Sequence, residues 1–407
     1  MPELRPFHGI RYSSSSDLPK LICPPYDIIS PEEQAALHAR HPHNAVHLEL
    51  AQGGKASYAE AGETFRAWLD DGTLARDPQP SLYVYRQDFV DGQGVRRRVA
   101  GVLGALALEP FGDSSGVLPH ERTMAGPKED RLALMRAVRA NVSPIYAVYR
   151  GGGELAPFFD SLAHRPTAGR AQDAQGILHR LWAVSAPGEV AMLQEAIAPG
   201  PLVIADGHHR YETALAYHGE RGRETGDHDS IMCFCVDADS EELVVLPYNR
   251  VLRAGAAPEE LAGRLRERLD ATPLDDEDPQ DFLSGSKADH AFVFVFEGER
   301  LGVEVSDEQV VAAVGERAPA WRALDVVALH EVVFPALLPD GPAELAFTKD
   351  PTELDRRVRA GWTAGVLLRA LRPADVVEVA TSGERMPQKA SYFWPKAATG
   401  LVFRELD

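Results

Sequence analysis

The fold is decided by one run of the sequence, Leu202-Val203-Ile204-Ala205-Asp206-Gly207-His208-His209-Arg210. Its first four residues are apolar and predict a short buried strand, and Gly207 lets the chain turn sharply. After the turn, helical spacing would place four residues on one face of a helix: Tyr211, Ala214, Leu215 and His218. The run therefore predicts a strand, a tight turn and a helix within an α/β protein that has mixed sheets and flanking helices.

The composition is that of a folded globular protein. Of 407 residues, 44% are hydrophobic and 25% are charged, which excludes a collagenous, coiled-coil or wholly disordered chain. The 42 Lys and Arg residues against 61 Asp and Glu residues give a net charge of −19. Such a charge repels polyanions, so nucleic acid is an unlikely partner by this criterion.

The cysteines and the apolar runs predict the cell compartment. Cys23, Cys233 and Cys235 form no disulfide framework, which fits a reducing cytoplasm. The longest charge-free apolar run, residues 99–108, is about half the roughly 20 residues that a membrane helix needs. We therefore expect a cytoplasmic protein with no membrane span and no signal peptide.

Several elements can be predicted from local patterns. Ser30, Pro31 and Glu33 form a capping box that predicts a helix over residues 31–40, with Tyr26 and Asp27 in the loop before it. That loop could also be a plain turn. Residues 81–90 and 96–108 predict two strands joined by a hairpin. A helix is expected over residues 325–334.

We divide the chain into three segments. Residues 1–110 are expected to form an N-terminal α/β segment, residues 111–270 the core that contains the Asp-Gly-His-His-Arg turn, and residues 271–407 a C-terminal α/β segment. The acidic, proline-bearing stretch 272–280 is the expected place for a domain junction or an exposed excursion.

The turn after the predicted strand has the chemistry of an anion site. The N–H groups and the dipole of the following helix point at it and attract phosphate. Arg210 opposes that dipole, which makes sense if an anion binds. Alternatively, Arg210 pairs with a structural carboxylate and the histidines are hydrogen-bonded in a core. The adjacent histidines are a weak metal site, because neighbouring histidines rarely chelate one ion together. Walker A, GxGxxG and GxSxG motifs do not occur.

Two further clusters could bind phosphate. His120, Glu121 and Thr123 precede Lys128 and Arg131, and together they could hold a phosphate and its metal, or form a solvated helix start. Near the C-terminus, two lysines flank aromatic residues. The stretch, which is either a stacking face or a buried terminal strand, is Lys389-Ala390-Ser391-Tyr392-Phe393-Trp394-Pro395-Lys396.

Five motifs follow one another along the chain. They are Cys23-Pro24-Pro25-Tyr26-Asp27; His120-Glu121-x-Thr123 with Pro127-Lys128-x-Asp130-Arg131; Ala205-Asp206-Gly207-His208-His209-Arg210-Tyr211-Glu212-Thr213; Leu246-Pro247-x-x-Arg250; and Met386-Pro387-Gln388-Lys389 with Phe393-x-Pro395-Lys396. Together they resemble a bacterial and archaeal domain-of-unknown-function family, sometimes described as chromosome-partitioning (ParB/SpoOJ) proteins, over nearly the whole chain. The Asp-Gly-His-His-Arg core is also similar to that of the ParB/sulfiredoxin-like superfamily. That superfamily includes nucleotide-dependent kinases of free L-serine, CTP-binding partition proteins and ATP-using sulfiredoxins.

The resemblance implies a ParB/sulfiredoxin-like core that binds a nucleotide, ATP or ADP with Mg²⁺, and transfers a phosphoryl group to a small hydroxyl metabolite such as free serine. The catalytic candidates are Asp206, His208, His209 and Glu121. The candidates for binding the nucleotide are Gly207, Arg210, Lys128, Arg131, Thr123, His120 and Lys389. One departure from the family pattern is Ala390-Ser391, where Ser-Thr is expected after Lys389.

Two other functions remain open from the sequence. A ParB-like, nucleotide-controlled DNA-partition switch would need a basic helix-turn-helix, which the sequence does not show. A phosphatase or other hydrolase would use the same phosphate pocket with water as the acceptor.

Overall fold

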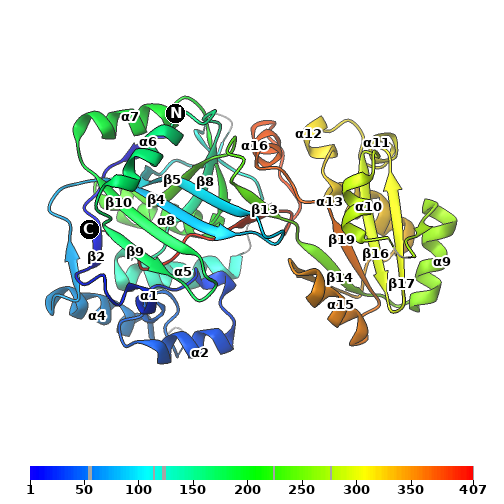
Figure 1. Cartoon of the computed structure of the whole chain (residues 1–407), viewed down its shortest axis with the longest axis horizontal. Coiled ribbons are helices and arrows are strands. Elements are labelled where there is room, and N and C mark those ends of the chain that lie inside the picture. Colours follow the sequence, from blue (N-terminus) through cyan, green and yellow to red (C-terminus); the bar gives the residue numbers. More distant parts are fainter. Residues whose placement is uncertain (54–56, 113–114, 122–124, 223–224, 276, 407) are drawn as a thin grey trace. The chain divides into compact units, whose positions relative to one another are not determined.

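A computed structural model describes residues 1–53, 57–112, 115–121, 125–222, 225–275 and 277–406. The chain divides into two units, each of which can be followed by colour in Figure 1. The first unit comprises Met1–Pro119, Thr123–Leu243 and Pro395–Asp407, and the second comprises His120–Arg122 and Val244–Trp394.

These boundaries differ from the predicted division at residues 110 and 270. The reason is long-range strand pairing, because strands from both sides of residue 110 belong to one sheet. The acidic stretch 272–280 lies inside the second unit and is largely exposed, so it is an excursion rather than a junction.

A nine-stranded mixed sheet organises the first unit, in the order β6-β11-β8-β12-β5-β4-β10-β9, with β1 beside β5. The pairs β6–β11 and β8–β12 are parallel and the other neighbours are antiparallel. The strands are β1 Leu4–Arg5, β4 Leu82–Val90, β5 Arg96–Ala107, β6 Val117–Pro119, β8 Ile145–Tyr149, β9 Gly169–Gln172, β10 Leu178–Val184, β11 Leu202–Asp206 and β12 Ser230–Asp237. Two short pairs complete the unit: β2 Ile10–Tyr12 with β3 Leu74–Arg76, and β7 Ala140–Asn141 with β21 Arg404–Glu405.

Helices pack against this sheet. One face, together with helices α6 to α8, forms a core that includes Val84, Val102 and Tyr211. The helices and 3₁₀ turns of the unit are α1 Leu18–Leu21, η1 Tyr26–Ile28, α2 Pro31–Arg40, α3 Val46–Glu49, α4 Ser57–Asp70, α5 Ala125–Val138, α6 Ala156–Ser161, η3 Leu162–His164, α7 Pro187–Ile197, α8 His208–Arg221 and η4 Asp227–Asp229.

The local predictions for this unit are confirmed. Helix α2 spans Pro31–Arg40, and the Ser30 hydroxyl accepts a hydrogen bond from the Glu33 N–H at 3.2 Å. Strands β4 and β5 pair as an antiparallel hairpin, with Val90 opposite Arg96. The decisive run forms strand β11 and helix α8 with Gly207 between them.

The second unit contains a six-stranded antiparallel sheet in the order β15-β17-β16-β19-β14-β18 and a separate β13–β20 pair. Its strands are β13 Val244–Leu246, β14 Asn249–Arg253, β15 Thr272–Pro273, β16 His290–Phe296, β17 Glu299–Val305, β18 Glu344–Thr348, β19 Ala364–Leu368 and β20 Tyr392–Trp394. Its helices are α9 Pro258–Leu269, α10 Pro279–Gly285, α11 Asp307–Val314, α12 Pro319–Arg322, α13 Asp325–Ala328, α14 Phe334–Leu337, α15 Pro351–Arg359 and α16 Pro373–Thr381. The helix predicted over residues 325–334 is interrupted by a π-helical turn, η5 Leu329–Val333.

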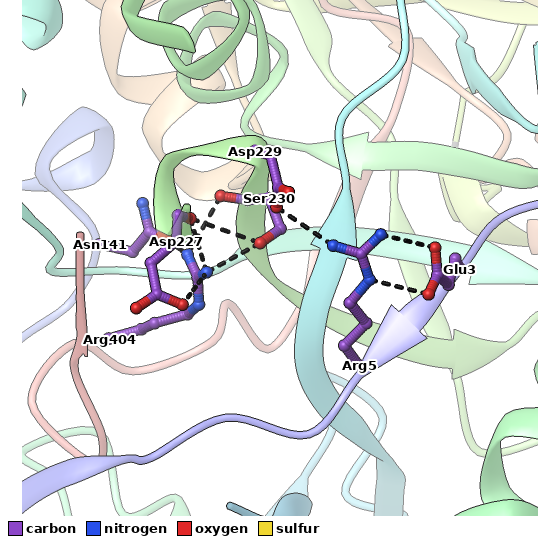
Figure 2. Close-up of polar contacts among 7 residues, drawn as sticks. All are labelled: Glu3, Arg5, Asn141, Asp227, Asp229, Ser230 and Arg404. Carbon is purple, nitrogen blue, oxygen red and sulfur yellow. Dashed lines mark hydrogen bonds and ion pairs between the residues drawn. The ribbon is translucent and has the colours of Figure 1, made fainter. Parts of the chain in front are cut away.

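An arginine near the C-terminus fastens β21 to the sheet of the first unit. Figure 2 shows the buried Arg404 side chain pointing at Asp227 and Ser230, with Asn141 beside it. Its Nη2 atom donates to the Ser230 hydroxyl at 2.7 Å and to the Asp227 carbonyl at 2.6 Å. Arg5 on β1 reaches Asp229 in the same loop at 3.1 Å. Both chain ends are therefore tied to the start of β12.

We expect Arg404→Ala to destabilise the first unit by about 3 kcal/mol, because it leaves buried polar partners without a hydrogen bond. Amides of β7 and β12 should exchange hydrogen faster than in the wild type. Arg76→Ala, which removes only the exposed pair with Glu405, should change stability by less than about 1 kcal/mol. Equal effects of the two substitutions would contradict an anchoring role for Arg404.

Candidate active site

The turn between β11 and α8 has a backbone that only glycine fits well. Gly207 has φ +87° and ψ +28° and is the N-cap residue of α8. A Cβ atom there would lie 3.0 Å from both the Nε atom of Arg210 and the Cγ2 atom of Ile145. The pairing of β11 with β8 also shifts register between Ile204 and Asp206. Such an irregularity re-aims a side chain at the end of a strand, here Asp206.

Asp206 is held between two cations. Its Oδ2 atom lies 2.5 Å from the Nη2 atom of Arg210, and its Oδ1 atom accepts a hydrogen bond from the Nζ atom of Lys396. Burial alone would raise the pKa of this carboxyl group, but Lys396 and Arg210, with a smaller contribution from His208, hold the pKa well below its usual range. Asp206 is therefore a permanent carboxylate and a poor proton acceptor.

Arg210 is committed to the protein rather than open to a ligand. Besides Asp206, it donates from Nη1 to the Pro144 carbonyl and, at 3.3 Å, to the Ser143 hydroxyl. The residue is only 8% exposed, and its Nε atom has no hydrogen-bond partner among the described residues. The pairing with Asp206 matches the alternative of a structural carboxylate partner, and the role of Arg210 in binding phosphate stays a prediction. In this structure Arg210 positions Asp206.

A second carboxyl group, that of Asp27, interacts electrostatically with Asp206. Asp27 belongs to the 3₁₀ turn η1 and remains in contact with solvent. The pKa of Asp27 is raised, first by the surrounding protein atoms and then by the negative charge of Asp206. The positive charges of Arg210 and Lys396 lower it by a smaller amount. The pKa values of Asp206, at the end of β11, and of Asp27, in η1, are therefore shifted in opposite directions, a pattern that separates acid–base groups from permanent charges.

The buried Glu49 fixes the loop that carries Asp27. Its Oε1 atom accepts hydrogen bonds from the Tyr26 N–H at 3.2 Å and from the Ser143 hydroxyl at 2.9 Å. Because Ser143 also accepts from Arg210, Glu49 connects the Tyr26 turn with the Asp206 pair. Glu49 is 2% exposed. It therefore acts through the protein rather than on a ligand.

Arg131 and Lys128 also meet protein groups. All three guanidinium nitrogens of Arg131 donate to protein oxygen atoms, those of the Asp130 carboxylate and the Glu49 carbonyl, and its guanidinium lies 4.2 Å from the centre of the Tyr26 ring. Lys128 forms an ion pair with Glu212 on α8. In the structure Arg131 thus contacts the Tyr26 turn and Lys128 joins α5 to α8, and their role in binding the nucleotide stays a prediction.

The remaining predicted residues fall in three places. His208 is buried and His209 half-buried in the first turn of α8. His120, Glu121 and Lys389 belong to the second unit, where the His120 Nε2 atom meets the Ser391 hydroxyl at 3.0 Å, Glu121 forms a β-bridge with Met386, and Lys389 lies 5.2 Å from the centre of the Tyr248 ring. Thr123 lies outside the described residues.

Sequence reasoning did not assign three residues of this site. The sequence patterns place Asp27 in a loop without a role, do not mark Glu49, and indicate Lys389 rather than Lys396 as a nucleotide-binding residue. A signal existed for Lys396, because Pro395 and Lys396 end the same C-terminal motif. Glu49 also stands out as an acid between the apolar residues Leu48 and Leu50.

The described residues contain no group of three or more His, Cys, Asp or Glu side chains that could hold a metal ion by itself. None of the helices in this described part is long and apolar enough to cross a membrane.

Fold and site together define a mixed α/β protein with a charged strand-to-helix turn. The chain belongs to the family described as "Protein of unknown function (DUF1015)", whose model matches residues 4–327. A search of curated proteins finds no match.

Three solved structures are similar to this chain, each with a low sequence identity and a low TM-score. One is a free serine kinase in complex with ADP, at 12% identity and a TM-score of 0.36, covering 70% of this chain and 88% of that chain. A conserved hypothetical protein from Pyrococcus furiosus has 12% identity and a TM-score of 0.34, over 72% and 90%. C-terminally truncated SbnI from Staphylococcus aureus has 11% identity and a TM-score of 0.39, over 74% and 87%.

We expect Asp206→Asn to destabilise the protein at neutral pH by roughly 3 kcal/mol, because Lys396 and Arg210 lose their buried counter-charge. Since the folded pKa of Asp206 lies below the value of 3.8 for an unperturbed carboxyl group, its contribution is present above about pH 4 and is lost as the pH falls further. The denaturation midpoint of the wild type should fall with pH in that range more steeply than that of the variant.

Asp17→Asn is the matched control for this measurement. Asp17 pairs with Lys20 on the surface, and exposed pairs contribute little. The ion-pair account of Asp206 would be contradicted if the two variants had the same stability at neutral pH.

Proposed function

We propose that the protein is a nucleotide-dependent phosphotransferase that acts on a small hydroxyl metabolite, with free L-serine as the first acceptor to test. The observation that carries this proposal is the geometry of the strand-to-helix turn, where Arg210 and Lys396 hold Asp206 next to the first turn of α8. Phosphoryl transfer needs positioned cations around the phosphates and a group that takes the proton of the acceptor. Lys396 and Arg210 at Asp206 are the cations, and Asp27 of η1 is the candidate for the group that takes the proton.

The nucleotide phosphates, of ATP or ADP, would bind at the N-terminus of α8. The first-turn N–H groups after Gly207 point along the helix axis toward the turn and favour negative charge. Lys396, whose ammonium group already lies at Asp206, adds a positive charge, and His209 is half-buried in the same helical turn. Arg210 keeps Asp206 and the turn in place.

Mg²⁺ fits this donor set through the nucleotide. The ion is commonly held by one or two carboxylates together with substrate phosphates, and each oxygen of Asp206 has a lone pair beyond its ion pair. Asp206 would therefore be its protein ligand. Bound there, Mg²⁺ would neutralise charge on the transferred phosphoryl group.

Asp27 is our candidate for the general base. A raised pKa brings a carboxylate closer to the working pH and makes it a better proton acceptor than Asp206. Asp27 takes the proton of the acceptor hydroxyl while the oxygen forms a bond to the terminal phosphorus. The bond from that phosphorus to the bridging oxygen breaks, and the shortened nucleotide leaves with the bond's electron pair. Asp27 thus replaces Asp206 and Glu121 in the role predicted from sequence.

Asp27→Asn should abolish acceptor-dependent release of ADP or AMP while leaving the protein at least as stable at neutral pH. A raised folded pKa means that ionised Asp27 opposes folding, so removing the charge relieves that opposition. The stability difference should vanish below about pH 4, where the carboxyl group is protonated in both folded and unfolded chains. Asp17→Asn serves as the control for activity and stability, and retained turnover in Asp27→Asn would refute the assignment.

Lys396→Met should weaken binding of ATP or ADP by about tenfold or more in titration calorimetry, as expected for loss of a charge-assisted contact. Lys20→Met, which changes an exposed lysine, is the control. Weaker nucleotide binding in Lys389→Met, with unchanged binding in Lys396→Met, would instead favour Lys389 as the binding residue. Absence of nucleotide binding by the wild type would overturn the proposal, and phosphate release without any hydroxyl acceptor would identify a hydrolase.

A further inference from the structure

A cavity of about 800 Å³ opens elsewhere on the first unit, and the proposed reaction does not use it. Tyr149, the last residue of β8, lines this cavity, whereas Asp206 is paired with Tyr146 near the start of β8. The cavity therefore lies at the other end of that strand. Its volume is within the range of small-molecule sites, roughly 300–1,000 Å³.

Arginines gather on the sheet face at the cavity. In the β4–β10 register Arg86 stands directly opposite Arg180, and Arg180 stands opposite Arg170 on β9. Like charges directly opposite one another destabilise a sheet. On β5, Arg96 and Arg98 lie on the same face, opposite Val90 and Asp88. Arg86, Arg96 and Arg98 line the cavity.

One carboxylate serves three of these guanidinium groups. Asp88 lies 3.2 Å from the Nε atom of Arg86, 3.3 Å from that of Arg98 and 2.8 Å from the Nη1 atom of Arg180. Arg98 has a further partner in Asp160. The positive charge around Asp88 is therefore only partly compensated.

Arg86 is the buried member of this group. The residue is 5% exposed, and its Nε atom donates to Asp88, whereas its terminal nitrogens donate to none of the described residues. Burial, and then the charges of Arg98 and Arg180, lower the pKa of Arg86, although Asp88 opposes the shift. Such a group would gain from a bound anion.

The other acids at the cavity are engaged in local structure. Asp237 accepts hydrogen bonds from the N–H groups of Gly151 and Gly153, and Glu242 accepts one from the Arg98 N–H. The rest of the wall includes apolar and aromatic surface from Phe89, Tyr149, Leu155 and Phe159. The lining of the cavity thus combines arginines and acids in equal number with apolar and aromatic surface.

We propose that this cavity is a second ligand site, which binds a small organic anion with a carboxylate or phosphate head against Arg86 and an apolar or aromatic body against Phe159 and Tyr149. Arg96 and Arg98, at the start of β5, frame the head group. The site is separate from the strand-to-helix turn, so its occupancy does not depend on the proposed phosphotransfer.

The test is titration calorimetry of the whole chain with phenyl phosphate and, separately, phenylacetate. We expect at least one of them to bind, and the tighter one identifies the head group. Arg86→Gln should weaken binding about tenfold or more. Ala156→Trp, at an exposed residue of α6 that lines the cavity, should abolish binding by filling the space and keeps the test valid if Arg86→Gln does not fold. Arg170→Ala, in the same arginine row but outside the cavity lining, should bind like the wild type.

Three results would overturn the proposal. The first is that neither probe binds the wild type. The second is that binding is unchanged in Ala156→Trp. The third is that Lys396→Met loses the binding while Ala156→Trp retains it, which would place the probe at the strand-to-helix turn.

Discussion

The first unit depends on one ion-paired carboxylate, Asp206, which Arg210 and Lys396 hold from two sides. These three groups come from the end of β11, the first turn of α8 and a segment 190 residues further along the chain. Taking such charges out of water costs several kcal/mol, and only close pairing offsets that cost. Because Arg210 also donates to Ser143 and Pro144, and Ser143 donates to Glu49, the pairing extends to the loop of Tyr26. Removing any member leaves a buried charge or dipole without its partner.

The same pairing contributes to the pKa of the neighbouring Asp27. The surrounding protein atoms raise that pKa most, and the negative charge of Asp206 raises it further. Asp206 thus stays ionised, while Asp27 holds its proton more tightly than an isolated carboxyl group does. Accessibility agrees with that division of roles, since Asp27 meets solvent and Arg210 does not.

Local sequence signals predicted local structure well and long-range structure poorly. The Ser30 cap and the β4–β5 hairpin depend on residues within a few positions of each other, and both were predicted. The unit boundary at Leu243 was not, because it follows from pairing of β12 with β5 across more than a hundred residues. The choice of Lys396 over Lys389 has the same origin: spacing cannot show which of two lysines reaches Asp206. Nor did the pattern over residues 325–334 show the π-helical turn, because apolar spacing there fits a helix of either kind.

The net charge of −19 repels an anionic ligand, whereas cations at the two proposed sites attract it. At a distance the ligand meets a mean negative field, but at physiological ionic strength this field is screened beyond about 8 Å. Close to the protein, individual cations act on the ligand at short range, namely Lys396 at Asp206 and the arginines around Asp88. Buried or partly buried charges are screened far less than exposed ones. Arg86 and Lys396, both largely buried, therefore keep their attraction at salt concentrations that suppress the surface repulsion, and selective binding of small anions is compatible with an acidic protein.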